Sequence, residues 1–142
     1  MGEKEKDVTM STPFGALKQI DAGLLNVGYA EAGPADGPAV LLLHGWPYDI
    51  HSFAEATPVL ASAGYRVIVP FARGHGTTRF LSGDTVRNGQ QAVLAVDVIA
   101  LMDALGIGRA ILGGFDWVGG RPISSRRCGR TAARVWSPSA GI

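Results

Sequence analysis

The chain has 142 residues, of which 46% are hydrophobic and 18% charged, and its formal net charge is +1. This length is enough for one domain with a real core, and the composition is typical of an ordinary soluble protein. The one cysteine, Cys128, excludes an internal disulfide and favours a reducing, cytoplasmic location. No apolar run is long enough to span a membrane, and the polar first residues contain no apolar core of a secretory signal.

The first third of the chain predicts a sheet edge followed by a buried strand. Residues 1–12 are expected to form a flexible leader. Residues 17–33 alternate loosely and include three glycines, which favours an antiparallel hairpin at the edge of a sheet. After a turn rich in Gly and Pro, Ala39–Leu43 is apolar at every position. A strand buried on both faces has this pattern, so we expect a central parallel strand.

A short helix and a second buried strand are expected next. Thr57 can cap the helix, Pro58 suits its first turn, and Gly64 is expected to follow its end. Residues 66–70 then predict a buried strand. Residues 71–83 are polar and contain glycine, which predicts a loop.

The clearest helix is expected over residues 88–105. Its apolar side chains recur at helical spacing on one face, at Leu94, Val98, Leu101 and Leu105. Residues 110–112 predict one more strand. The alternation of strands and helices predicts an α/β fold with a doubly wound, mostly parallel sheet and an N-terminal antiparallel hairpin.

Glycines surround an acidic residue directly after this last strand, in Gly113-Gly114-Phe115-Asp116-Trp117-Val118-Gly119-Gly120. This is the layout of a nucleophile elbow, a tight strand-to-helix turn that presents one side chain above the carboxyl end of a sheet. A carboxylate in that position can attack an electrophilic carbon and form a covalent ester. Taken alone, the window favours a plain turn in which Asp116 bonds its own backbone. Segments upstream reverse that preference.

Three upstream segments accompany the elbow in a fixed order: His44-Gly45-Trp46-Pro47, residues 64–70, and Arg73-Gly74-His75-Gly76. Together with Asp116 and Trp117 they resemble the N-terminal part of an α/β-hydrolase. An aspartate elbow followed by Trp is similar to the epoxide hydrolase and haloalkane dehalogenase branch, and the His-Gly-Trp-Pro loop favours the epoxide hydrolases. The resemblance runs from about residue 14 to residue 117.

The resemblance implies a cofactor-independent hydrolase that acts on an apolar epoxide or alkyl halide. Asp116 would be the nucleophile, and the backbone N–H groups of Trp46 and Trp117 would form the oxyanion hole. Gly45 would let the loop backbone come close, and Pro47 would fix its exit. We expect no cofactor, no metal, no nucleic acid and no membrane partner. The sequence does not indicate an oligomeric state.

Several of these residues also have a purely structural interpretation. Gly114 is expected to be one of the small residues that the elbow needs. His44 is expected to bond loop backbone rather than to act as the general base. His51 and His75 are expected to be exposed loop residues without the spacing of a metal site. Trp46 and Trp117 could instead be core aromatics.

Two acids of the long helix, Asp97 and Asp103, are expected to face solvent. The glycine pairs around Asp116 could suggest a phosphate site, but the carboxylate would repel an anion.

Residues 118–142 depart from the family pattern. Val118 occupies the last glycine place of the elbow, and the segment contains five basic residues but no Asp, Glu or His. This fold would need a further helix and strands, a lid, a second acid and a general-base His there. We therefore expect a hydrolase part over residues 13–117, an atypical basic tail over 118–142, and an incomplete, inactive hydrolase. The alternatives are a non-catalytic α/β fragment or binding module with a structural Asp116, and RNA binding by the basic tail.

The composition of the tail suggests a shift of reading frame near Val118. Translation of the coding sequence past this codon in the other two frames is expected to give a helix, further strands and a histidine. If neither frame gives them, this interpretation is wrong.

Overall fold

The computed structural model describes residues 14–114, apart from the side chain of Gln91. The expected leader, the elbow at Asp116 and the basic tail lie outside the described residues. The elements in chain order are β1 (Lys18–Ala22), β2 (Leu25–Ala32), β3 (Ala39–Leu43), the 3₁₀ helix η1 (Ile50–Phe53), α1 (Ala56–Ser62), β4 (Arg66–Pro70), β5 (Arg79–Phe80), α2 (Gln91–Ala104) and β6 (Ala110–Gly114).

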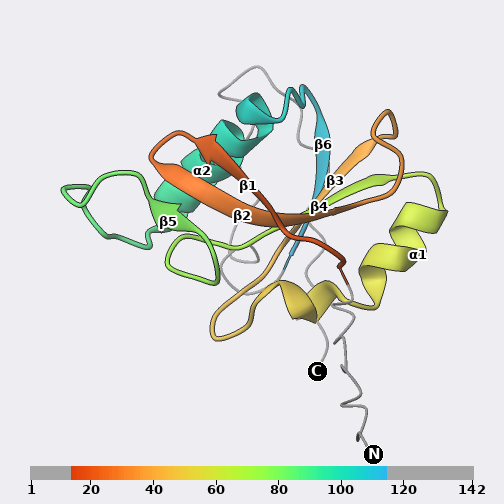
Figure 1. Ribbon diagram of the computed structural model, residues 1–142, viewed down its shortest axis with the longest axis horizontal. Coiled ribbons are helices and arrows are strands. Elements are labelled where there is room, and N and C mark those ends of the chain that lie inside the picture. The colour runs from red at the N-terminus through yellow and green to blue at the C-terminus, as the bar shows by residue number, and fades with distance from the viewer. Residues whose placement is uncertain (1–13, 115–142) are drawn as a thin grey trace, which may run out of the picture.

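These strands form one twisted sheet in the order β1-β2-β4-β3-β6, with β5 paired to β2 (Figure 1). β3 runs parallel to both β4 and β6, whereas β2 runs antiparallel to β1, β4 and β5. Among the described strands, β2 alone therefore opposes the direction of the others. This confirms the mostly parallel α/β sheet and the N-terminal hairpin. In that hairpin Ala22 pairs with Leu25, and Gly23 adopts a positive φ of 59° in the two-residue turn.

Side chains of the central strands alternate between two separate cores, because successive residues of a strand point to opposite faces. Leu41 and Ile68 belong to the core on the side of α2, and neither is exposed to solvent. Val40 and Val67 belong to the core on the other side, which includes Ile50 of η1 and is flanked by α1. Both faces of β3 and β4 are covered, which is why Ala39–Leu43 and residues 67–70 are apolar without interruption.

The helices differ from the sequence prediction at their beginnings. α1 starts at Ala56 with Glu55 in the N-cap position, so the expectation that Thr57 caps it is wrong. Thr57 is 2% exposed and its hydroxyl has no hydrogen-bond partner within the described residues, since this side chain faces the core rather than the helix end. Gly64 does follow the helix, with a φ of 94° that favours glycine.

The long helix begins later than expected, and the expected loop before it contains a short strand. α2 begins at Gln91 rather than at residue 88, because Asn88 instead accepts a hydrogen bond from the Gln90 amide through its side chain. The expected loop over residues 71–83 contains the short strand β5, which pairs with β2 through Phe80 and Leu25. This pairing ties the loop to the sheet beside α2.

Candidate active site

The carboxyl ends of β3 and β6 lie side by side, and the expected catalytic segments begin there. The two strands pair in parallel along their whole length, and the last pair is Leu43 with Gly114. Both residues are buried. A Cβ on the neighbouring Gly113 would lie 3.1 Å from the Leu42 side chain, which is a tight contact. Asp116 and Trp117 lie outside the described residues, but His44, Gly45, Trp46 and Pro47 are described.

His44 is a buried residue whose two ring nitrogens both have backbone partners. Its Nδ1 lies 3.1 Å from the Gly45 carbonyl oxygen, and its Nε2 lies 3.0 Å from the amide nitrogen of Ala72. A carbonyl can only accept a hydrogen bond and an amide N–H can only donate one. The ring must therefore be neutral and carry its proton on Nδ1. The expectation that His44 bonds loop backbone is confirmed.

The environment of His44 keeps the ring neutral. Burial, at 5% exposure, lowers the pKa of His44, and the hydrogen bond to the Gly45 carbonyl opposes this effect only in part. His75 lowers the pKa further, whereas Asp49 raises it. A general base must exchange protons, so a ring held in one neutral tautomer by two backbone groups fits a structural role.

The loop after His44 presents an aromatic side chain to solvent. Gly45 is buried, and its carbonyl oxygen also accepts a hydrogen bond from the Tyr48 amide at 2.9 Å. Trp46 is 64% exposed, so the alternative of a core aromatic is wrong at this position. The peptide between Trp46 and the exposed Pro47 is cis. Hydrogen bonds to the buried Gly45 thus fix the backbone of this loop, while the Trp46 side chain lies at the surface.

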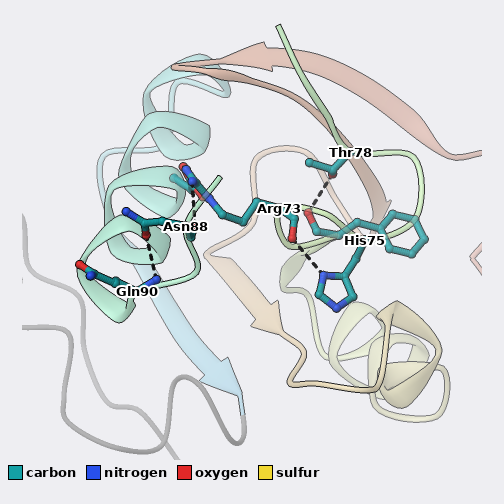
Figure 2. Close-up of polar contacts among 7 residues, drawn as sticks. Arg73, His75, Thr78, Asn88 and Gln90 are labelled. Carbon is teal, nitrogen blue, oxygen red and sulfur yellow. Dashed lines mark hydrogen bonds and ion pairs between the residues drawn. The ribbon is translucent and has the colours of Figure 1, made fainter. Parts of the chain in front are cut away.

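His75 lies against His44 instead of pointing freely into solvent. The centroids of the two rings are 4.9 Å apart and their planes meet at 70°. Figure 2 shows the other contact of His75, in which Nδ1 lies 3.1 Å from the Arg73 carbonyl oxygen. His75 is half-buried, so the expectation of an exposed residue is wrong. His51 is exposed as expected, in η1, with Nδ1 2.9 Å from the Asp49 carboxylate.

A buried ion pair connects the loop after β4 to α2. The Arg73 guanidinium donates two hydrogen bonds of 2.7 Å to the Asp97 carboxylate and a third, of 3.1 Å, to the Asn88 carbonyl oxygen. The Arg73 and Asp97 side chains are 6% and 17% exposed. The bond to Asp97 raises the pKa of Arg73. The expectation that Asp97 faces solvent is therefore wrong, whereas Asp103 is exposed as expected.

The residue spacing along α2 could have indicated that Asp97 has a cationic partner. Asp97 lies three residues after Leu94 and four before Leu101, which puts it on the apolar face rather than opposite to it. A carboxylate on that face needs a cationic partner, because burying an unpaired charge is costly. Arg73 supplies the partner from the other side of the gap between helix and sheet.

A cavity opens between α2 and the carboxyl ends of β3 and β4. Its walls are mostly apolar, and its polar lining comes from His44, Arg73 and Asp97. Leu43 and Phe71 form the sheet side of the same cavity. Within residues 14–114, no group of three or more His, Cys, Asp or Glu residues is placed to hold a metal ion. None of the helices in this part of the chain is long and apolar enough to cross a membrane.

The fold agrees with what is found among known proteins. The model of the α/β-hydrolase fold family matches residues 38–121, more than half of the chain, so the chain belongs to this family. Epoxide hydrolase A of Mycobacterium tuberculosis (strain ATCC 25618 / H37Rv) is 33% identical over 98 residues, which are 69% of this chain and 30% of that protein. Epoxide hydrolase 2 of Siraitia grosvenorii is 38% identical over 98 residues, with the same two shares.

The similar solved structures also carry the name epoxide hydrolase. A crystal structure from Klebsiella pneumoniae subsp. pneumoniae, of a protein provisionally named an epoxide hydrolase, is 60% identical with a TM-score of 0.73, over 74% of this chain and 35% of that one. Potato (Solanum tuberosum) epoxide hydrolase I is 27% identical with a TM-score of 0.70, over 86% and 39%. The chain is thus epoxide hydrolase-like in sequence and fold. It spans about 30% of the length of the curated relatives named above.

Replacement of Asp97 tests the buried ion pair. Asp97→Asn leaves the Arg73 guanidinium buried without its counter-charge, so we expect the free energy of unfolding to fall by about 3 kcal/mol. The matched control is Asp103→Asn on the same helix, where the side chain is exposed and a change below about 0.5 kcal/mol is expected. Urea unfolding followed by circular dichroism measures both values. Equal effects of the two substitutions would contradict a stabilising role for the pair.

The neutral state of His44 predicts a loss of stability in mild acid. Above the unfolded pKa of about 6.5, both the folded and the unfolded chain hold this ring neutral. As the pH falls below that value, the unfolded chain takes up a proton that the folded chain does not, so the free energy of unfolding decreases. The charged or titratable neighbours are His75, Asp49, and the Arg73–Asp97 pair across the cavity.

Urea unfolding between about pH 7 and about pH 5 measures this loss. His44→Asn is expected to flatten the pH dependence. If the free energy of unfolding of His44→Asn depends on pH as strongly as that of the wild type, other groups cause the loss.

Proposed function

We propose that this chain carries the nucleophile and oxyanion-hole part of a hydrolase that opens epoxides, or displaces halide from alkyl halides, through an ester on Asp116. The observation that carries the proposal is the parallel pairing of β3 and β6, which ends at Leu43 and Gly114. Leu43, the residue before the His44–Pro47 loop, and Gly114, two residues before Asp116, are thus neighbours in the sheet, which supports the proposal. The names of the relatives favour the epoxide as substrate.

The first step would be attack by a carboxylate oxygen of Asp116 on an epoxide carbon. One carbon–oxygen bond forms and one epoxide carbon–oxygen bond breaks, and the released oxygen takes a proton to become a hydroxyl group. In the second step, water attacks the ester carbonyl, and the negative charge that develops on its oxygen needs N–H donors already in place. The Trp46 and Trp117 amides are our candidates for those donors.

The second step also needs a general base, and none of the histidines upstream of the elbow is suited to it. His44 has both ring nitrogens bonded to backbone, and neither His51 nor His75 lines the cavity beside α2. Residues 118–142 contain no Asp, Glu or His. We therefore propose a hydrolase unit over residues 13–117, a tail that adds no base, and a chain that forms the ester without hydrolysing it.

A binding module without covalent chemistry is the second candidate. The cavity beside α2 is lined mostly by apolar groups and does not require Asp116, so a small apolar ligand could bind there reversibly. Covalent labelling separates the two candidates, because only the first places a reactive carboxylate at residue 116.

Incubation with an aryl epoxide such as styrene oxide, followed by intact-mass spectrometry, tests the proposed function. The chain is expected to gain the mass of one epoxide molecule, and peptide mapping is expected to place it on Asp116. The Asp116→Asn variant, which keeps the size of the side chain but removes the charged nucleophile, is expected to gain none. Asp103→Asn is the control for losing an acid elsewhere. No adduct on a folded wild-type chain, or equal labelling of Asp116→Asn, would refute the proposal and favour the binding module.

A further inference from the structure

We propose that His44 is a positioning residue that orients the peptide between Gly45 and Trp46, so that the Trp46 N–H is aimed where an oxyanion develops. This inference rests on the proposed function, in which that N–H is a donor. It assigns His44 a task beyond filling space: the direction of one hydrogen bond from its ring sets the direction of a catalytic amide.

The argument begins with the geometry of a peptide bond. The Gly45 carbonyl and the Trp46 N–H belong to one planar group, and in a trans peptide they point in opposite directions. The Gly45 oxygen accepts two hydrogen bonds, one from His44 Nδ1 at 3.1 Å and one from the Tyr48 amide at 2.9 Å. Two donors on one carbonyl oxygen restrict rotation of the whole plane. The N–H on its other side is therefore fixed before a substrate arrives, as oxyanion stabilisation requires.

The His44 ring is itself held from the other side. The Ala72 amide donates to Nε2 at 3.0 Å, which reserves the ring proton for Nδ1. The rings of Phe71 and His75 meet the His44 ring edge to face, with centroids 6.4 Å and 4.9 Å away. The tautomer and the orientation of the ring are thus set by the loop that follows β4.

That loop has its own anchor. Arg73, the residue after Ala72, is fixed to Asp97 of α2 by the two 2.7 Å bonds. A continuous set of contacts therefore runs from α2 through the Arg73 loop and the His44 ring to the Gly45–Trp46 peptide. Each contact has a defined donor and acceptor, so the proposal distinguishes a directed hydrogen bond from simple packing.

Two substitutions at His44 separate the two ring contacts. Asn can place an amide N–H near the position of Nδ1, and so can still donate to the Gly45 oxygen, but it does not reach the Ala72 amide. Gln can place its oxygen near the position of Nε2 and accept from Ala72, but it leaves the Gly45 oxygen without the side-chain donor. If His44 positions the peptide, His44→Gln slows cleavage of the Asp116 ester more than His44→Asn does. If His44 only holds the two loops together, His44→Asn slows it at least as much.

Cleavage of the Asp116 ester by hydroxylamine supplies the readout. The chain is first labelled with the epoxide, and excess reagent is removed. Hydroxylamine nitrogen then attacks the ester carbonyl, the ester carbon–oxygen bond breaks, the diol leaves with a proton, and a hydroxamate remains on residue 116. An oxyanion forms on the way, so the Trp46 N–H should accelerate this step without any general base from the protein. Intact mass against time gives the rate.

We expect His44→Gln to slow hydroxylamine cleavage about 30-fold and His44→Asn about threefold, a part of the loss seen when a whole oxyanion donor is removed. His51→Asn, at an exposed ring outside this set of contacts, is expected to match the wild type. Equal rates for the two His44 variants, or a slower His44→Asn, would overturn the proposal. Near-ultraviolet circular dichroism identifies a variant that has lost its fold.

A second measurement on the unaltered chain does not depend on Asp116. Nitrogen-15 NMR of the histidine rings reports which nitrogen carries the proton, and we expect Nδ1–H for His44 at neutral pH. A proton on Nε2, or exchange between both tautomers, would overturn the proposal even if the adduct forms. If no adduct forms but Nδ1 is protonated, the proposed function fails while the orientation of the Gly45–Trp46 peptide by His44 is supported.

Discussion

The parallel pairing of β3 with its two neighbours is the constraint on which the rest of this structure depends. β3 lies between β4 and β6, and all three run in the same direction. Their carboxyl ends consequently open at one edge of the sheet, where the loops after β3 and β4 meet through His44 and the Ala72 amide. The cavity beside α2 is lined by residues at these carboxyl ends, which is where open α/β sheets generally bind ligands.

Much of the fold could be predicted from the sequence, because burial on both faces leaves a clear pattern. Ala39–Leu43 is apolar at every position, and the structure places it between two strands with a core on each side. His44 follows such a strand directly, which marked it as a loop residue at the carboxyl end of the sheet. Its role in bonding backbone came from the family resemblance, and the structure shows both of its partners.

The features missed by the sequence analysis depend on contacts between distant parts of the chain. Asp97 pairs with Arg73, 24 residues earlier, and the spacing that puts Asp97 on the apolar face of α2 does not identify this partner. His75 packs on His44 across 31 positions of sequence only because the loops after β3 and β4 come together. Thr57 has the right residue type for a helix cap, but the packing of α1 directs it into the core. The roles of Asp116 and Trp117, and the cytoplasmic location, stay predictions.

The order of the strands has a consequence for how the chain folds during synthesis. β2 and β3 follow one another in sequence, but β4 lies between them in the sheet. As the chain leaves the ribosome, residues 25–43 therefore emerge as two strands whose inner edges have no native partner until residues 66–70 appear. Unpaired apolar edges are templates for pairing with other chains. β4 covers the inner edges of β2 and β3 when it enters the sheet, and the other edge of β3 is covered only when β6 follows. The strand order thus exposes the growing chain to pairing with other chains until both strands have been made.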